Sequence, residues 1–148
     1  MAGVPRHVAE HRLNNYKSME PVVQKKRPLG AERNKAMNEQ VRELFNAGII
    51  RKCRRQTWIA NPVMVLKKIG SWRMCVDYKD LNKACPKDHY PLPEIDLKVD
   101  SLAPFKFKCF LDAYRGYHQI QMAQEDDDRT AFRPDTEIYC YTKMPFGL

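Results

Sequence analysis

Long hydrophobic runs are missing from the sequence, in which no apolar stretch approaches the roughly 20 residues that a membrane span requires. The amino-terminal segment MAGVPRHVAEHRLNNYK lacks the apolar core of a signal peptide. Spaced metal-ligand pairs such as C-x-x-C or H-E-x-x-H are missing as well. These absences argue against a membrane protein, secretion by this route and a zinc site, so we expect a soluble intracellular protein.

Cysteine is present in an odd number and without regular spacing, at Cys53, Cys75, Cys85, Cys109 and Cys140. This arrangement gives poor support to a disulfide framework, which in small secreted domains uses an even number of cysteines. We therefore expect reduced thiols, most of them with a structural role.

Charge is distributed unevenly along the 148 residues, whose formal net charge is +8. Residues 1–55 hold 13 Lys and Arg against 5 Asp and Glu, whereas residues 56–148 hold 13 against 13. The excess includes the runs QKKR at 24–27 and RKCRR at 51–55. Such runs attract phosphate backbones, but a solvated basic face without a nucleic-acid partner has the same pattern.

Hydrophobic periodicity predicts a helix and a hairpin in the first half of the chain. Residues 1–30 carry little periodicity, and their prolines favour an extended lead-in along the surface. Apolar residues then recur at helical spacing from Ala31, and Gly48 is placed to end the helix. Residues 63–66 and 72–76 are typical of two strands, which the glycine-containing turn KKIGS joins into a β-hairpin.

The second half of the chain predicts a proline-rich connection followed by strands. Pro86, Pro91 and Pro93 exclude a central strand or long helix from residues 81–99, although a short helix fits residues 94–101. The alternating segments FKFKCFLDAY and HQIQMA predict two strands. The segment TAFRPDTEIYCYTKM predicts another hairpin, with its turn at residues 134–136.

Asp112 lies near the carboxyl end of the predicted strand FKFKCFLDAY, on its less apolar face. A carboxylate and the next backbone carbonyl can both offer oxygen ligands to a divalent cation there, although a lone aspartate at a strand end more often forms a turn or a cap. Lys67, Lys68 and Arg73 on the first hairpin make a basic clamp that can neutralise a triphosphate. Because nucleotidyl transfer needs metal-held charge and in-line positioning, these residue types suit nucleotide chemistry.

Five segments together resemble one family in their order and spacing: NPVMVLKK, SWRMCVDYKDLNKACPKDHYPLPEID, FLDAYRGYHQIQM, TAF and YCYTKMPFGL. With them the chain resembles the reverse transcriptase of gypsy-type LTR retrotransposons, from about His11 to Leu148. The resemblance implies an α+β fold of antiparallel hairpins and a few helices. It would be a partial right-hand polymerase, with fingers at about 31–100 and 120–148 and an incomplete palm at about 101–119.

The resemblance implies metal-binding and sugar-facing roles for several residues. Asp112 matches the first catalytic aspartate, which binds both magnesium ions, and the carbonyl of Ala113 matches a further ligand. The backbone of Arg115 and Gly116 would lie near the triphosphate. Tyr117 matches the aromatic gate beneath the sugar, which favours deoxynucleotides over ribonucleotides.

Three further positions follow from the resemblance, together with the partners of the enzyme. Arg73 matches the arginine that packs on the incoming base and contacts its phosphates. Lys68, or less closely Lys67, matches the lysine on the γ-phosphate. Phe146 falls close to the sugar, where retroviral relatives carry glutamine.

The implied partners are an RNA or DNA template-primer, deoxynucleoside triphosphates and the remaining palm, thumb and RNase H regions of a polyprotein. The implied location is the cytoplasm or a virus-like particle.

The family's Tyr-x-Asp-Asp turn does not occur in the 148 residues. The run QEDDD at 124–128 is no replacement, because no aromatic precedes it and it is typical of a solvated turn or the first turn of a short helix. We therefore expect no polymerase activity from this chain alone, and an exposed edge on its palm strand. A non-enzymatic nucleic-acid-binding remnant and a decayed gene product are the alternatives.

Overall fold

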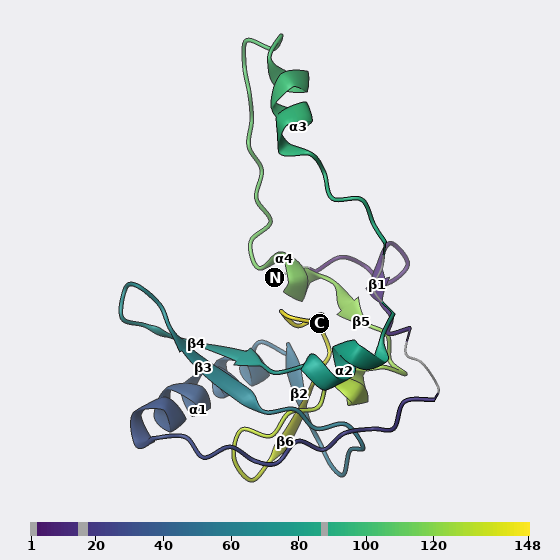
Figure 1. Ribbon diagram of the computed structural model, residues 1–148. Helices are drawn as coiled ribbons and strands as arrows, with labels where there is room; N and C mark the ends of the chain where they lie inside the picture. Colours follow the sequence, from purple (N-terminus) through teal and green to yellow (C-terminus); the bar gives the residue numbers. More distant parts are fainter. Residues whose placement is uncertain (1–2, 15–17, 87–88) are drawn as a thin grey trace.

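The structure of the chain, a computed structural model, describes residues 3–14, 18–86 and 89–148. Its helices are α1 (Ala31–Asn46), α2 (Lys79–Ala84), α3 (Ile95–Leu102) and α4 (Gly116–Gln119), with a 3-10 helix η1 (Asp127–Thr130). Its strands are β1 (Glu10–His11), β2 (Ile50–Cys53), β3 (Pro62–Leu66), β4 (Trp72–Val76), β5 (Gln121–Met122) and β6 (Ile138–Tyr141). In Figure 1 the helix α3 stands away from the body on two long extended segments. Within the described ranges no helix is both long and apolar enough to cross a membrane.

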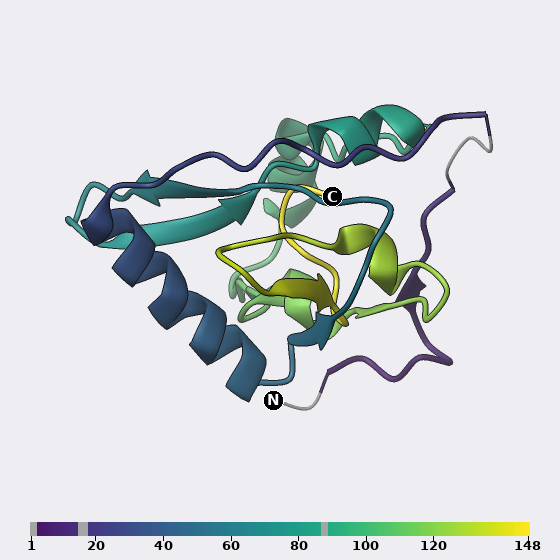
Figure 2. The same cartoon turned by 90° about the horizontal axis from the view of Figure 1, so that it is seen from below.

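The predicted first helix is confirmed as α1, which buries Met37 and Val41. The turn after it uses Gly48 at a φ of 66°, a left-handed conformation that glycine adopts without a steric penalty. Across this turn the Ile49 amide donates to the Leu44 carbonyl at 3.0 Å, so the chain reverses directly into β2. Figure 2 shows α1 starting beside the tip of the β3–β4 hairpin and diverging from it, with β6 in the angle between them.

The predicted first hairpin is confirmed as β3 and β4, which pair antiparallel with Val65 opposite Arg73. Its turn is closed by the Lys67 amide, which donates to the Ser71 carbonyl at 2.8 Å, and Gly70 takes a φ of 80°. Neighbouring strands joined by a short turn lose little entropy on pairing. Local alternation was therefore enough to predict this element.

The strands β2 and β6 pair antiparallel although most of the chain separates them. The predicted hairpin before β6 forms where the backbones of Phe132 and Tyr139 exchange hydrogen bonds at 2.9 and 3.0 Å. A disulfide joins Cys53 of β2 to Cys140 of β6, with Cα atoms 6.2 Å apart. This corrects the expectation of reduced thiols throughout, because strand pairing makes neighbours of two cysteines that are 87 positions apart. Cys75, Cys85 and Cys109 are free.

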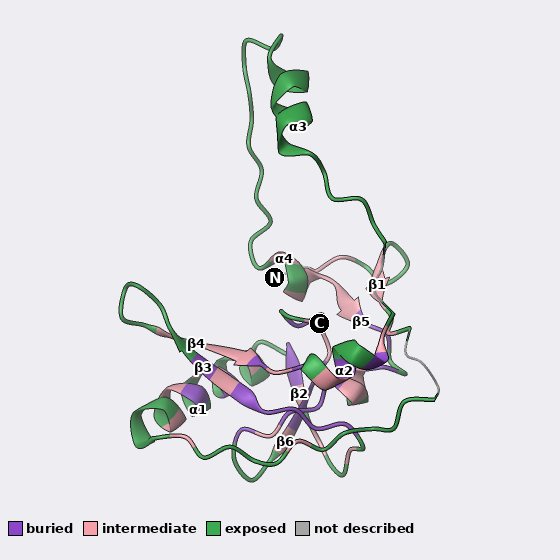
Figure 3. Ribbon diagram, viewed as in Figure 1, coloured by how far each residue is buried: buried purple, intermediate pink, exposed green. Residues whose placement is uncertain are grey.

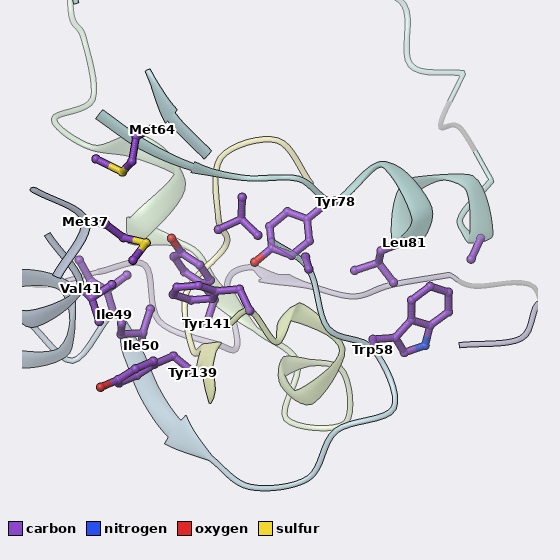
Figure 4. Packing of buried hydrophobic residues seen from close by; sticks show 14 residues of the cluster. Met37, Val41, Ile49, Ile50, Trp58, Met64, Tyr78, Leu81, Tyr139 and Tyr141 are labelled. Carbon is purple, nitrogen blue, oxygen red and sulfur yellow. The ribbon is translucent and has the colours of Figure 1, made fainter. Parts of the chain in front are cut away.

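One buried cluster joins α1, both antiparallel strand pairs and α2. Figure 4 shows its labelled side chains converging from these elements, with Tyr141 at the centre of the view. Phe132 is fully buried, and its ring centroid lies 5.4 Å from that of Tyr141. The Tyr78 hydroxyl donates to the Thr130 carbonyl at 2.9 Å within this core. The core therefore fixes β4 relative to the carboxyl-terminal segment.

The strand predicted for FKFKCFLDAY does not form, because residues 105–112 are irregular. Phe107, Phe110 and Leu111 are 86%, 85% and 93% exposed. Figure 3 shows that residues 89–115 are exposed. This stretch carries α3, the helix expected near residues 94–101. A strand needs a neighbour for its backbone hydrogen bonds, and the described residues place none beside this segment.

The second predicted strand, HQIQMA, is also largely wrong, because residues 118–119 end α4 and only β5 remains extended. β5 pairs in parallel with β1 of the amino-terminal segment, with His11 opposite Met122. The Val4 amide donates to the Gln119 carbonyl at 2.8 Å. The amino-terminal segment is thus packed against α4 and β5, which local alternation could not indicate.

The short helix η1 begins within the acidic run QEDDD, as expected, but the side chains of this run are not simply solvated. Asp126 is only 4% exposed and accepts hydrogen bonds from the Leu13 amide at 2.8 Å and from Arg129 at 2.9 Å. Asp127 pairs with Arg51 at 2.9 Å. This run therefore holds the amino-terminal third to the carboxyl-terminal third.

Candidate functional site

A cleft of about 710 Å³ lies between α1, β4, α4 and the carboxyl-terminal segment. Among the residues that line it are six that the sequence singled out: Lys67, Arg73, Arg115, Gly116, Tyr117 and Phe146. Lys68, Asp112 and Ala113 do not line it. The fold thus brings together residues from the hairpin, from α4 and from the MPFGL segment.

The cleft carries basic side chains on two of its walls. Lys67 and Arg73 come from the hairpin, and Arg115 comes from the turn before α4. All three are exposed, and none forms an ion pair within the described part of the chain. Glu39 and Glu43 of α1 line the same cleft. A ligand here meets concentrated positive charge beside a smaller acidic region.

The turn before α4 holds Arg115 in a left-handed conformation, with φ 48° and ψ 47°. Side chains other than glycine and asparagine rarely take this conformation, because Cβ crowds the backbone. Two hydrogen bonds fix the turn: the Gly116 amide donates to the Ala113 carbonyl at 3.1 Å, and the His118 amide donates to the Arg115 carbonyl at 2.9 Å. The Arg115 guanidinium lies 5.5 Å from the ring centroid of Tyr114. The strain therefore sits where the chain turns into the cleft.

Two aromatic rings meet at the cleft in an edge-to-face contact. The rings of Tyr117 and Phe146 have centroids 5.7 Å apart and planes at 79°. This geometry is favourable for aromatic pairs. Tyr117 is 51% exposed, so part of its ring remains available to a ligand.

His118 is a cleft residue that sequence reasoning did not select. Its Nδ1 is buried without a hydrogen-bond partner among the described residues. Burial lowers the pKa of its imidazole, and the nearby charge of Arg115 lowers it further. No local motif marks this histidine, whose ring lies beside that of Tyr141, with centroids 6.4 Å apart, only because the chain folds.

Gln40 is a second cleft residue that sequence reasoning missed. It occupies the helical stripe formed by Met37, Val41 and Leu44, where the remaining members are apolar. A polar residue in a core-facing stripe is the signal that could have identified it, because a buried amide needs partners.

Asp112 lies outside the cleft lining, exposed in the irregular segment before α4. Its carboxylate and the Ala113 carbonyl are oxygen donors of the kind that magnesium prefers. Two oxygen donors are too few to hold the ion by themselves. The described residues contain no group of three His, Cys, Asp or Glu side chains that could hold a metal ion. The donor types fit a divalent cation, but the described residues do not complete its coordination.

The two basic runs of the first third are partly neutralised within the molecule. Arg51 pairs with Asp127, and Lys52 with Glu137 at 2.6 Å. The hydrogen bond from Lys52 is the main reason why the pKa of Glu137 lies below its usual range. In the run QKKR, Lys26 and Arg27 pair with acidic residues as well. Much of the positive charge therefore serves internal contacts.

Comparison with known proteins shows which family the chain resembles. The family described as reverse transcriptase (RNA-dependent DNA polymerase) matches residues 65–148. The chain is 31% identical over 132 residues to the retrovirus-related Pol polyprotein from transposon 297 of Drosophila melanogaster. It is 32% identical over 136 residues to that from transposon gypsy of the same organism. These alignments cover 86% and 87% of the chain, but the chain spans only 12% and 13% of the polyproteins.

Solved structures with the same fold come from foamy virus. A mutant of the prototype foamy virus protease-reverse transcriptase matches 94% of the chain with a TM-score of 0.79 and 22% identity, over 18% of its own length. The foamy viral enzyme in complex with double-stranded DNA matches 94% with a TM-score of 0.72 and 19% identity, over 23% of its length. At these identities the likeness establishes a shared fold.

Proposed function

Because the chain belongs to the reverse transcriptase (RNA-dependent DNA polymerase) family, we propose that it forms the fingers and the first part of the palm of a retrotransposon RNA-directed DNA polymerase. The fingers would comprise residues of about 31–100 and 120–148, and the palm about 101–119, after a lead-in over 1–30. In the complete enzyme the reaction would be attack of a primer 3'-hydroxyl on the α-phosphate of a deoxynucleoside triphosphate.

The convergence of three basic side chains with two aromatic rings on one cleft is the observation that carries this proposal. A triphosphate is a compact polyanion, and arginine binds phosphate oxygens in bidentate fashion. We assign Arg73 and Lys67 to the phosphates from the hairpin, with Lys68 at the same tip, and the turn of Arg115 and Gly116 to the opposite side. This arrangement would enclose the triphosphate between two elements.

The sugar of the nucleotide would lie against Tyr117. Its edge contact with Phe146 leaves the tyrosine ring as a wall beside the basic groups. A rigid ring at this place would clash with a ribose 2'-hydroxyl and would accept a deoxyribose. The proposed selectivity is therefore steric, and it depends on the ring and not on the tyrosine hydroxyl.

Reverse transcriptases are generally dependent on divalent metal ions, and we propose magnesium for this one. Asp112 and the carbonyl of Ala113 would hold it, and the ion would neutralise charge that develops on the phosphates. The Ala113 carbonyl already accepts a hydrogen bond from Gly116, which leaves its second lone pair for a metal. Because the 148 residues contain no Tyr-x-Asp-Asp sequence, we expect no primer extension from them by themselves.

An RNA or DNA template-primer is the proposed macromolecular partner, together with the other regions of a polyprotein. A foamy viral enzyme that shares the fold is described in complex with double-stranded DNA. The two relatives from Drosophila melanogaster are polyproteins, of which this chain spans only 12% and 13%. Both observations support partners of this kind.

Equilibrium titration with a deoxynucleoside triphosphate and magnesium tests the nucleotide site directly. We expect Arg73→Ala to weaken binding about tenfold or more, since a charge-assisted hydrogen bond is worth roughly 1.5–3 kcal/mol. Arg42→Ala removes the same charge from the exposed side of α1, outside the cleft, and should leave binding unchanged. Absence of binding by the unaltered chain, or an equal loss in both variants, would contradict the proposed site.

A further inference from the structure

Gln40 of α1 bridges two backbone groups of β4 that flank Arg73. Its Nε2 donates to the Trp72 carbonyl at 2.8 Å, and its Oε1 accepts from the Met74 amide at 2.8 Å. The opposite edge of β4 is paired with β3, where Val65 lies opposite Arg73. The backbone around Arg73 is therefore held on both edges.

A primary amide is well suited to this bridge. It offers a donor and an acceptor side by side, as the backbone of a neighbouring strand does. Gln40 thus takes the place of a further strand along two residues of the edge of β4. Replacement by an apolar side chain would leave the Trp72 carbonyl and the Met74 amide without these partners.

Other contacts between α1 and β4 hold a side chain and not the backbone. The Trp72 indole donates to Glu32 at 3.2 Å, and the Arg33 guanidinium lies 5.4 Å from the Trp72 ring centroid. These contacts fix where the tryptophan lies on α1. Within the part of the chain that the structure describes, only the amide of Gln40 ties the strand backbone on both sides of Arg73 to α1.

We propose that Gln40 is a positioning residue for nucleotide binding, which fixes the backbone of β4 so that Arg73 is held toward the triphosphate. This inference rests on the proposed function, because it assumes that Arg73 binds the nucleotide. Gln40 lines the same cleft, but the nitrogen and the oxygen of its amide each bond to β4. We therefore expect its effect on the ligand to pass through Arg73, which the double-mutant cycle below tests.

Gln24 provides a matched control for this role. Its amide also bridges two segments, donating to the Asp77 carbonyl at 2.9 Å and to Asp80 at 2.9 Å, and accepting from the Asn61 amide at 2.9 Å. It lies at the base of the hairpin and does not line the cleft. Loss of either glutamine removes partners from backbone groups, but only Gln40 adjoins Arg73.

The test combines nucleotide titration with a double-mutant cycle. Gln40→Met should weaken deoxynucleoside triphosphate binding about five- to tenfold, within the range of coupling between residues of one network. Gln24→Met should lower stability without changing affinity. In an Arg73→Ala background, Gln40→Met should cause no further loss. Gln40→Asn keeps the amide but places it one methylene short of β4, so it should repeat the effect of Gln40→Met without adding an apolar side chain to the cleft.

Amide hydrogen exchange supplies a readout that does not involve nucleotide. Exchange at Met74 should accelerate in Gln40→Met and Gln40→Asn and stay slow in Gln24→Met. Unchanged affinity in both Gln40 variants, or an undiminished loss in the Arg73→Ala background, would overturn the positioning role. If the unaltered chain binds triphosphate and Arg73→Ala weakens that binding, either of these results overturns the positioning role of Gln40 and leaves the proposed function standing. If the unaltered chain does not bind, the proposed function falls and this inference falls with it.

Discussion

Arg115 occupies a backbone conformation that its side chain disfavours. Its φ of 48° costs roughly 1–2 kcal/mol for an ordinary L-residue. Strain of this kind persists where the surrounding structure imposes it, often at functional sites. Here the hydrogen bonds of Gly116 and His118 impose the turn that leads into α4 and places Tyr117 at the cleft.

Arg115→Gly should raise the free energy of unfolding by about 0.5–1 kcal/mol, because relief of the strain exceeds the extra entropy of glycine in the unfolded chain. The same change should weaken triphosphate binding through loss of the guanidinium. Urea denaturation and nucleotide titration measure the two effects. Arg42→Gly in the regular helix α1 is the control, and it should destabilise by about 1 kcal/mol. A loss of stability in Arg115→Gly would refute the strain.

Two half-buried histidines should make the free energy of unfolding depend on pH. Burial lowers the pKa of His118, and burial also lowers that of His11, where Asp126 opposes the shift. A lowered pKa means that the unfolded chain binds a proton more readily than the folded one. The contribution of each is therefore complete above the unfolded value of about 6.5 and is lost as pH falls from there through the folded pKa.

We accordingly expect the free energy of unfolding to decrease as the pH falls below about 6.5, where the histidines of the unfolded chain bind protons. His118→Gln should flatten this decrease when urea midpoints are followed across the range. A profile that does not respond to His118→Gln would show that another group governs this range.

At the scale of elements, the segment 105–112 differs most from its prediction. Its alternation of phenylalanine with lysine has the period of a strand, but alternation specifies only which face of a strand is apolar. The hydrogen bonds must come from a neighbouring strand. Without one beside it among the described residues, the segment is irregular and its aromatic side chains are exposed.

Exposed phenylalanines should promote self-association and contribute little to folding. Phe107→Ser with Phe110→Ser should therefore reduce light scattering of concentrated samples and change the free energy of unfolding by less than about 0.5 kcal/mol. Phe132→Ser, at a fully buried position, is the opposite control, since loss of a buried phenylalanine costs about 3–5 kcal/mol. A comparable loss of stability in the double variant would mean that residues 107 and 110 are packed in solution.

At the scale of the whole molecule, the charge asymmetry of the sequence has two parts. Basic residues of the first third pair with acidic residues of the last third, as Arg51 does with Asp127 and Lys52 with Glu137. Arg54 and Arg55 lie just beyond and form no ion pair within the described part of the chain. These pairs hold β2 to the carboxyl-terminal third of the chain, whereas Arg54 and Arg55 are available to phosphate.

Two double charge reversals separate these roles at equal net charge. Arg54→Glu with Arg55→Glu should weaken nucleic-acid binding and reduce the slope of log affinity against log salt by about 1–2, since each neutralised phosphate contributes roughly 0.7–0.9. Arg51→Glu with Lys52→Glu should mainly lower stability, because it opposes acidic partners with new acids. Binding across a salt series and urea denaturation distinguish them. Equal loss of binding in both would indicate one continuous phosphate-binding patch.

The sequence by itself determined the elements whose partners are near in the chain. The helix α1 follows from its apolar stripe, and the β3–β4 hairpin follows from alternation around a short turn. The spacing of its motifs likewise identified the family, because residues such as Arg73 and Tyr117 stand in fixed order along the chain. These features depend on local periodicity or on the order of residues along the chain, so they can be recognised without the tertiary structure.

Only the tertiary structure decided what depends on contacts between distant segments. It joined Cys53 to Cys140, buried Asp126, and left residues 105–112 without a partner strand. It also brought the basic hairpin, the turn of Arg115 and the two aromatic rings to one cleft, with Gln40 bonded on either side of Arg73. The physical reason is that pairing, burial and the exclusion of water depend on which surfaces meet, and local periodicity does not contain that information.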